Sequence, residues 1–257
     1  KLAGIILAAG QGIRMKSRTT KVLHRLCGKE LLWYPVELLR QLGVERTVVV
    51  VSPANQDAVK KLLGDSVEYA LQSSATGTAG AAESATEILC GKFEQVVLMG
   101  SDSPLLSLQS LQRLVGEHLA HNRQMSILSG VVEDGSGLGR INRISGSKPD
   151  VLDIVEAGDD PDRPAEAIEV NSGVYCFQGN WLWENLQKVG AKVGGERYLT
   201  ELAAIAVRQG ESVSALRSDD PVEVLGINNR VELASLEDIK RRRIRERLML
   251  NGVTISD

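Results

Sequence analysis

The sequence has too few cysteines, and too little uninterrupted apolar chain, for several common classes of protein. Its three cysteines, Cys27, Cys90 and Cys176, lack a C-x-x-C spacing, so neither a disulfide framework nor a zinc site is supported. The apolar run over residues 2–9 is too short to span a membrane, and it leads into glycine rather than a small-residue cleavage site. We therefore expect a soluble protein of the reducing cytoplasm with no membrane partner.

Acidic residues are missing from the start of the chain. The first 29 residues contain no aspartate or glutamate, but they hold seven basic residues: Lys1, Arg14, Lys16, Arg18, Lys21, Arg25 and Lys29. The whole chain of 257 residues has a formal net charge of −3, so this basic stretch is local and we expect no nucleic-acid partner. With 43% hydrophobic residues the chain can bury a full core. The basic stretch is therefore suited to a small anionic ligand.

Apolar runs of strand length alternate with amphipathic helical segments in the first half of the chain. The expected strands are residues 2–9, 47–51, 67–71, 96–99 and 126–132. The expected helices between them are residues 31–42, 56–63, 78–89 and 108–121. This order predicts an α/β fold with a doubly wound, mostly parallel sheet, in which ligands bind beyond the carboxyl ends of the strands.

The pattern changes after about Gly135, where shorter and more polar strands are expected at residues 140–144, 151–155, 169–177 and 213–216. With helices at residues 181–189 and 198–208, this half is predicted to extend the sheet and close over the ligand. Residues 229–250 form a long helical pattern with an arginine-rich end, and residues 253–255 are strand-like. The basic end is consistent either with a solvated helix end, where it complements the helix dipole, or with a phosphate site.

The loop Gly10-Gln11-Gly12-Ile13-Arg14-Met15 fits neither of two common nucleotide-binding loops. No G-K-[ST] follows, so it is not a Walker A loop, and Met15 occupies the last position of G-x-G-x-x-G. The glycines alone are equally consistent with a tight turn. Because glycine lets backbone N–H groups approach phosphate oxygens closely, the acid-free basic run that follows favours a phosphate site.

A family resemblance begins in this loop. Leu7-Ala8-Ala9-Gly10-Gln11-Gly12-Ile13-Arg14-Met15, followed by Lys21-Val22-Leu23-His24, resembles the signature of sugar-nucleotide pyrophosphorylases. The K-V-L-H form is similar in particular to the uridyltransferase domains of bacterial bifunctional N-acetylglucosamine-1-phosphate uridyltransferases. The resemblance implies a Rossmann-like nucleotide-diphospho-sugar transferase fold with a sugar-binding sheet extension. It also implies that Arg14 and Lys21 are catalytic and that the nucleotide contacts Leu7, Ala8, Ala9, Gly10 and Gly12.

The resemblance divides the chain into three parts. It implies a nucleotidyltransferase domain over residues 1–228, a linker helix over 229–250, and a stub over 251–257 that resembles the start of a left-handed β-helix. An oligomer is possible in a longer natural chain.

Later motifs agree with the resemblance in order and spacing. Gln72, Gly77 and Thr78 resemble the segment that reads uracil, although Gln72 alone would also suit a strand end. Asp102, in Gly100-Ser101-Asp102-Ser103-Pro104-Leu105, resembles the metal ligand of the G-D-x-P-L segment, and Asn228 resembles the second ligand. Taken singly, Asp102 also fits a turn or helix cap, and Asn228 fits the N-cap of the last helix.

The resemblance places the sugar in the second half of the chain. Gly139, Glu156 and Asn171 match its sugar-binding positions, and Gly195-Glu196-Arg197-Tyr198-Leu199-Thr200-Glu201 resembles the G-E-Y-Y-L-T-D stretch that helps wall the sugar site. Four positions depart from the family pattern near the nucleotide and the metal: Ile13, Thr20, Gly100 and Ser101. None of these departures removes a charge that the reaction requires.

The implied activity is Mg²⁺-dependent formation of UDP-N-acetylglucosamine and pyrophosphate from UTP and N-acetylglucosamine-1-phosphate, for synthesis of peptidoglycan and lipopolysaccharide-type cell envelopes. The attacking phosphate is already an anion, so no catalytic base is required and His24 is expected to be structural. Two alternatives stay open. One is transfer with another sugar or nucleotide, such as glucose-1-phosphate with UTP or dTTP, and the other is a catalytically silent nucleotide-binding regulatory domain.

Overall fold

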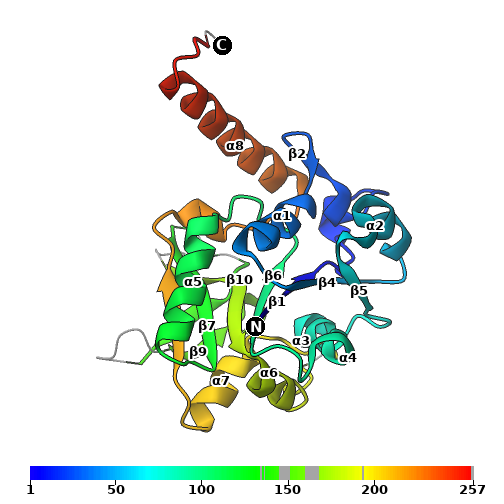
Figure 1. The fold of residues 1–257 in the computed structure, drawn as a ribbon, viewed down its shortest axis with the longest axis vertical. Helices are drawn as coiled ribbons and strands as arrows, with labels where there is room; N and C mark the ends of the chain where they lie inside the picture. Colours follow the sequence, from blue (N-terminus) through cyan, green and yellow to red (C-terminus); the bar gives the residue numbers. More distant parts are fainter. Residues whose placement is uncertain (134, 136, 145–150, 160–167, 193, 256–257) are drawn as a thin grey trace.

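The structure is a computed structural model that describes the chain except residues 134, 136, 145–150, 160–167, 193 and 256–257 (Figure 1). Its main sheet has the strand order β11-β7-β10-β6-β1-β4-β5, with β8 beside β10 and β9 beside β8. The strands are β1 (Leu2–Leu7), β4 (Arg46–Val51), β5 (Glu68–Leu71), β6 (Gln95–Gly100), β7 (Met125–Val132), β8 (Arg140–Arg143), β9 (Val151–Val155), β10 (Ile168–Gln178) and β11 (Val213–Arg217).

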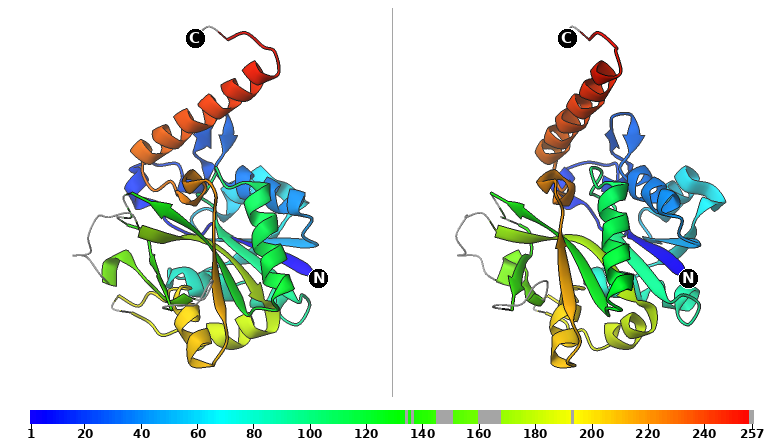
Figure 2. Two further views of the ribbon diagram at one scale, coloured as in Figure 1. Left: turned by 90° about the vertical axis from the view of Figure 1, so that its left-hand side faces the viewer. Right: turned by 60° about the vertical axis from the view of Figure 1, so that its left-hand side comes forward.

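Helices cover both faces of this sheet (Figure 2). On one face lie α1 (Trp33–Leu42), α2 (Gln56–Leu63) and α5 (Leu108–Ala120). On the other lie α3 (Gly77–Glu83), α4 (Thr86–Leu89), α6 (Gly179–Leu186) and α7 (Glu201–Arg208). Successive strand residues point to opposite faces, so Ile5 and Ile6 enter different core clusters. The predicted doubly wound α/β fold is confirmed.

The second half does more than extend the sheet at one side. Strand β10 pairs antiparallel with both β6 and β7, so it lies in the middle of the sheet. Tyr175 and Phe177 enter one core cluster while Val174 and Cys176 enter the other. A strand covered by helices on both faces requires such a continuous apolar run. The sheet is mostly parallel as predicted, and the second half extends it, with β10 inserted between β6 and β7.

Several boundaries differ from the prediction. The helix expected over residues 78–89 is two helices, α3 and α4, because the chain turns at Ser84 and Ala85. Residues 253–255 lie in no strand, so the strand expected there is not formed. A hairpin of β2 (Arg25–Leu26) and β3 (Lys29–Glu30) and two short 3₁₀ helices, η1 (Ile13–Met15) and η2 (Lys21–Leu23), were not foreseen.

The last helix, α8 (Arg230–Leu250), projects from the body of the molecule (Figure 1). Leu236 is its one buried residue. Part of its basic end is paired, since Arg241 binds Glu237 and Arg243 binds Asp220. This arrangement favours the solvated-end interpretation. Within the described ranges, none of the helices combines the length and the apolar character that crossing a membrane requires.

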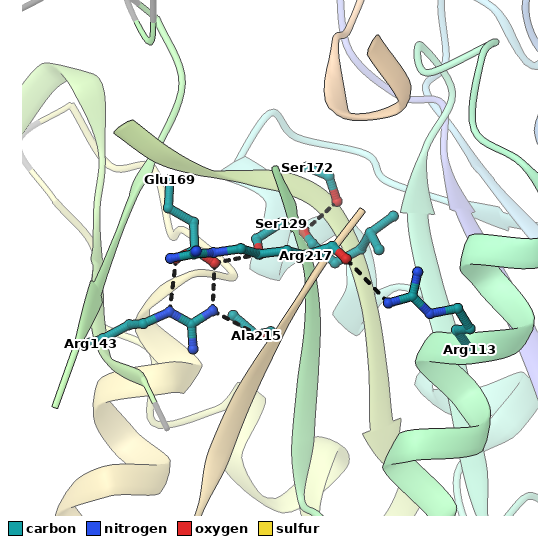
Figure 3. Close-up of polar contacts among 8 residues, drawn as sticks. Arg113, Ser129, Arg143, Glu169, Ser172, Ala215 and Arg217 are labelled. Atoms are coloured by element: carbon teal, nitrogen blue, oxygen red, sulfur yellow. Dashed lines mark hydrogen bonds and ion pairs between the residues drawn. The ribbon is translucent and has the colours of Figure 1, made fainter. Parts of the chain in front are cut away.

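An ionic cluster around the buried carboxylate of Glu169 fastens the β8–β9 hairpin to the sheet (Figure 3). Glu169 on β10 accepts hydrogen bonds from Arg143 on β8 (2.6 and 2.8 Å), Arg217 on β11 (2.8 Å) and Ser129 on β7 (2.6 Å). Burial alone would raise the pKa of Glu169, but these three donors hold it at about 2. We call these four residues the Glu169 clamp.

Candidate active site

The parallel strands bring three chemically distinctive segments to one edge of the sheet. Leu7 lies level with Gly100 of β6 and Val50 of β4, and Leu71 of β5 lies level with Val51. The carboxyl ends of four strands are therefore neighbours. The loop over residues 8–12 follows β1, Asp102 follows β6 and Gln72 follows β5.

The loop after β1 is held close to the sheet. Ala8 donates from its backbone N–H to Val50 O (2.9 Å), and both Ala8 and Ala9 are buried, while Gly10 is exposed. Gly12 has φ +62°, and a Cβ at this position would lie 2.6 Å from the Cβ of Lys21. Glycine is therefore required there, because Lys21 packs directly against the backbone of the loop.

Arg14, Lys21, Asp102 and Asn228 meet beyond these strand ends, and we call this group the phosphate corner. The ammonium of Lys21 donates to Asp102 Oδ2 (2.5 Å) and to Asn228 Oδ1 (3.1 Å). Arg14 Nη2 donates to the same amide oxygen (3.0 Å). The side chains of Lys21 and Asp102 are 14% and 29% exposed, so both are partly accessible to solvent. Residues far apart in the sequence thus form one cationic site.

The start of α8 delivers Asn228 to this corner. The N-cap of α8 is Asn229, whose side chain accepts from the backbone N–H groups of Val231 and Glu232 (both 2.9 Å). The alternative that Asn228 caps the helix was therefore wrong. The backbone N–H of Ile227 also donates to Asp102 O (2.9 Å), which ties this segment to the loop after β6.

The oxygens of Asp102 and Asn228 suit a divalent cation. Both accept from one ammonium, so they already converge on a single positive charge. No cluster of three or more His, Cys, Asp or Glu side chains suited to a metal occurs in the part of the chain that the structure describes. Small divalent cations are commonly held by one or two protein oxygens together with substrate phosphates and water. The residues present fit a cation that binds jointly with a phosphate ligand.

Gln72, Gly77 and Thr78 lie together at the end of β5. Gln72 Nε2 donates to Gly77 O (3.1 Å), and its backbone N–H donates to Val51 O (2.8 Å). Gly77 has φ +84°, and a Cβ there would lie 2.5 Å from the carbonyl oxygen of Arg197. Thr78 Oγ1 accepts from the backbone N–H of Leu199 (2.9 Å), so this hydroxyl holds residue 199 beside the start of α3.

Gly139, Glu156 and Asn171 form a second group around the β8–β9 hairpin. The backbone N–H of Asn171 donates to Gly139 O (2.8 Å), and a Cβ at Gly139 would lie 3.6 Å from Glu156 Oε2. Glu156 Oε1 accepts from Thr200 Oγ1 (2.7 Å). Asn171 Nδ2 donates to the hydroxyl of Tyr175 (2.6 Å), whose pKa is raised by burial. The hydroxyl therefore stays protonated and fixes the orientation of the amide.

No role was predicted for Tyr175, and Thr200 was predicted only as part of the segment that walls the sugar site. The partnership of Tyr175 with Asn171 depends on the register shift of β10 between these two residues, which no local pattern reveals. Thr200 reaches Glu156 from 44 residues away. Both contacts are tertiary, so only the folded chain shows them.

Three of the four departures from the family pattern can be placed in the structure. Ile13 is 77% exposed and fills no core position. Thr20 has φ −58° and ψ 144°, a conformation that proline also adopts, so threonine preserves the entry to Lys21. Ser101 is buried beside Asp102. His24 Nε2 is buried and has no hydrogen-bond partner among the described residues, and nothing in the structure gives it a chemical task.

The chain matches a known family and a known fold. The family model described as nucleotidyl transferase matches residues 3–221. Among solved structures, a putative glucose-1-phosphate thymidylyltransferase from Bacillus anthracis, in complex with a sucrose, superposes with a TM-score of 0.77. The match covers 100% of this chain and 98% of that one at 18% identity, so it shows a shared fold.

Curated relatives are considerably more similar in sequence. The bifunctional protein GlmU of Bacillus licheniformis is 38% identical over 258 residues, and that of a Geobacillus species is 40% identical over 258 residues. GlmU of Clostridioides difficile is 40% identical over 254 residues. These alignments cover 98–100% of this chain but only 54–56% of the relatives, so the chain spans about half their length.

Proposed function

We propose, because this chain belongs to the nucleotidyl transferase family, that it transfers the uridylyl group of UTP to N-acetylglucosamine-1-phosphate. A phosphate oxygen of the sugar phosphate attacks the α-phosphorus of UTP. The new O–P bond forms as the bond from the α-phosphorus to the bridging oxygen breaks, and pyrophosphate leaves with that electron pair. The product, UDP-N-acetylglucosamine, would feed synthesis of peptidoglycan and lipopolysaccharide-type envelopes in the cytoplasm.

The phosphate corner is the observation that carries this proposal. The nucleophile is already an anion, so the protein must chiefly neutralise charge and align two polyanions that repel one another. Arg14 and Lys21 supply two fixed cations at the carboxyl edge of the sheet, beside the glycine loop. Neither a nucleophilic side chain nor a general base is needed. Their place between the loop and Asp102 supports roles in binding and orienting the triphosphate.

We infer that the divalent cation is Mg²⁺, because the available ligands are hard oxygens. Asp102 and Asn228 would hold it, and when bound it would neutralise negative charge on the triphosphate. We assign the base and the sugar to the two other groups of residues, at the end of β5 and around the β8–β9 hairpin. An amide such as that of Gln72 carries both donors and an acceptor, which suits the edge of uracil. Gly139, Glu156 and Asn171 offer backbone, carboxylate and amide groups to sugar hydroxyls and an N-acetyl group.

Pyrophosphate release across a matrix of substrates tests this function. UTP, dTTP, CTP and GTP are each paired with N-acetylglucosamine-1-phosphate and glucose-1-phosphate. We expect the largest kcat/KM for UTP with N-acetylglucosamine-1-phosphate. A preference for dTTP or glucose-1-phosphate would assign the chain to a related transferase. Binding of UTP without turnover in any pair would instead indicate a silent nucleotide-binding domain.

We further propose that residues 1–228 form the transferase domain and that α8 is a linker.

A further inference from the structure

Arg197 lies where the nucleotide end of the site meets the sugar end. Its backbone N–H donates to Thr76 O (2.9 Å), and its carbonyl oxygen accepts from the backbone N–H of Ala79 (3.0 Å). A Cβ at Gly77 would collide with the same carbonyl, so the two backbones are in direct contact. The start of α3, which follows Gln72, is therefore hydrogen-bonded through its backbone to the segment over residues 195–201.

The guanidinium of Arg197 uses all three of its nitrogens. Nε donates to Val189 O (3.0 Å) and Nη2 donates to Leu186 O (2.5 Å), at and just beyond the carboxyl end of α6. Nη1 donates to Glu83 Oε2 on α3 (2.5 Å). The side chain of Arg197 is only 20% exposed, and shielded charge-assisted bonds of this kind are stronger than ion pairs in open water. The guanidinium thus fixes the segment against two helices at once.

The same segment ends at Glu156, in the group that Gly139, Glu156 and Asn171 form around the β8–β9 hairpin. Thr200, three residues after Arg197, donates its hydroxyl to Glu156 Oε1 (2.7 Å). Between them, Leu199 donates its backbone N–H to Thr78 (2.9 Å). A short piece of chain therefore runs from Gly77 and Thr78 to Glu156, and the side chain of Arg197 anchors it to α3 and α6.

We propose that Arg197 is a positioning residue that, through Glu83 and the carboxyl end of α6, couples nucleotide binding to sugar-phosphate binding. This inference rests on the proposed function and deepens it. A nucleotide base held at Gln72 fixes the start of α3, the start of α3 fixes residues 195–201, and these place Thr200 against Glu156. Coupling of this kind makes each ligand bind more tightly when the other is present.

The test measures that coupling directly. The affinity of N-acetylglucosamine-1-phosphate is measured by calorimetry with and without saturating α,β-methylene-UTP, in which the bond to be broken cannot be cleaved. The variants are Arg197→Ala, Arg197→Lys and Glu83→Gln. The matched control is Glu87→Gln, because Glu87 lies exposed on the neighbouring helix α4. Steady-state pyrophosphate release by each variant gives KM and kcat separately.

We expect the nucleotide to tighten sugar-phosphate binding about 5-fold or more in the wild type and in Glu87→Gln. The ratio should fall toward 1 in Arg197→Ala and take an intermediate value in Arg197→Lys, which keeps the charge but not the three-way geometry. The kcat/KM for the sugar phosphate should fall about 10- to 100-fold in Arg197→Ala, as small misplacements in a site produce.

An unchanged ratio in Arg197→Ala, with a lower melting temperature, would show a merely structural role and overturn the inference while leaving the proposed function intact. If Arg197→Ala does not fold, unchanged ratios in both Arg197→Lys and Glu83→Gln overturn it equally. A wild type that releases no pyrophosphate from any substrate pair would overturn the proposed function, and the inference with it.

Discussion

The phosphate corner and the Glu169 clamp are built from the same parts, two cations and one carboxylate, but their carboxylates are satisfied differently. Glu169 is 7% exposed and accepts from Arg143, Arg217 and Ser129. Asp102 is 29% exposed and, over the described ranges, accepts a side-chain hydrogen bond from Lys21 alone. Protein donors surround the carboxylate of the Glu169 clamp, whereas the carboxylate of the phosphate corner has fewer protein donors and more contact with solvent.

This difference separates structure from function. When protein donors fill the acceptor sites of a buried carboxylate, removing one partner lowers the free energy of unfolding of the whole chain. A half-satisfied carboxylate beside two cations can exchange its partner for a ligand without unfolding the chain. We therefore expect changes in the phosphate corner to remove activity and changes in the Glu169 clamp to remove stability.

The largest effect is expected in the phosphate corner. Lys21→Ala or Asp102→Ala should lower turnover by roughly 10²–10³, as loss of one transition-state contact typically does. The free energy of unfolding should change little in either variant. Pyrophosphate release and urea denaturation measure the two quantities, with the exposed Arg18→Ala as control. Near-normal pyrophosphate release from Lys21→Ala or Asp102→Ala would contradict the assignment.

The clamp should show the opposite response. Glu169→Gln leaves two arginines beside a neutral amide, and we expect the free energy of unfolding to fall by about 2–4 kcal/mol, because a buried charge pair is broken. Turnover at 25 °C should fall less than tenfold. Glu184→Gln, on the exposed side of α6, is the control for denaturation. An unchanged denaturation midpoint for Glu169→Gln would remove the distinction between the two groups.

His118 is a second buried group that makes stability depend on pH, in a higher pH range than Glu169. Burial, together with repulsion from Arg123, lowers the pKa of His118 from 6.5 to about 4. Its ring contacts Ser126 and Gln95 (both 2.9 Å). Because the unfolded chain binds the proton more readily, stability is full above pH 6.5 and should fall by about 2–3 kcal/mol between pH 6.5 and 4. Glu169, with its pKa of about 2, should cause a further loss only below about pH 4.5.

Denaturation at several pH values tests these two windows. His118→Gln should flatten the profile between pH 6.5 and 4 and leave the loss at lower pH in place. A wild-type profile without a slope between pH 6.5 and 4 would contradict the neutral, buried state of His118.

The smallest effect distinguishes two neighbouring asparagines. Asn229→Ala removes the N-cap of α8 and should lower the free energy of unfolding by about 1 kcal/mol. Asn228→Ala should change it by less than about 0.5 kcal/mol while reducing turnover, because its side chain belongs to the phosphate corner. Equal losses of stability in both variants would show that the capping and binding tasks are not divided in this way.

Much of the fold follows from the sequence because apolar period and length are local properties. The alternation of strands and helices predicts a sheet with helices on both faces. Asp102, Gln72 and the glycine loop each follow a strand, so the sequence also places them at the same edge of that sheet. The place of β10 could not be predicted in the same way. Its apolar run shows that both faces are covered, but it does not say that β6 and β7 are its neighbours.

The candidate site was also predictable only in part. Resemblance to a known motif picks out single residues such as Asn228 and Glu156, because each stands at a fixed distance from its neighbours in the chain. It does not give their partners. The ties of Thr200 to Glu156 and of Arg197 to Glu83 join segments 44 and 114 residues apart. Such contacts depend on how the helices and the hairpin settle on the sheet.

The role of the phosphate corner is tested by pyrophosphate release from UTP and N-acetylglucosamine-1-phosphate, measured with Mg²⁺ and with the metal removed by chelation. The phosphate corner predicts steady release that requires both substrates and stops when Mg²⁺ is removed. It also predicts that Asp102→Ala loses this release and Glu169→Gln keeps it. Absence of release with Mg²⁺ present, or equal release without the metal, would contradict the account.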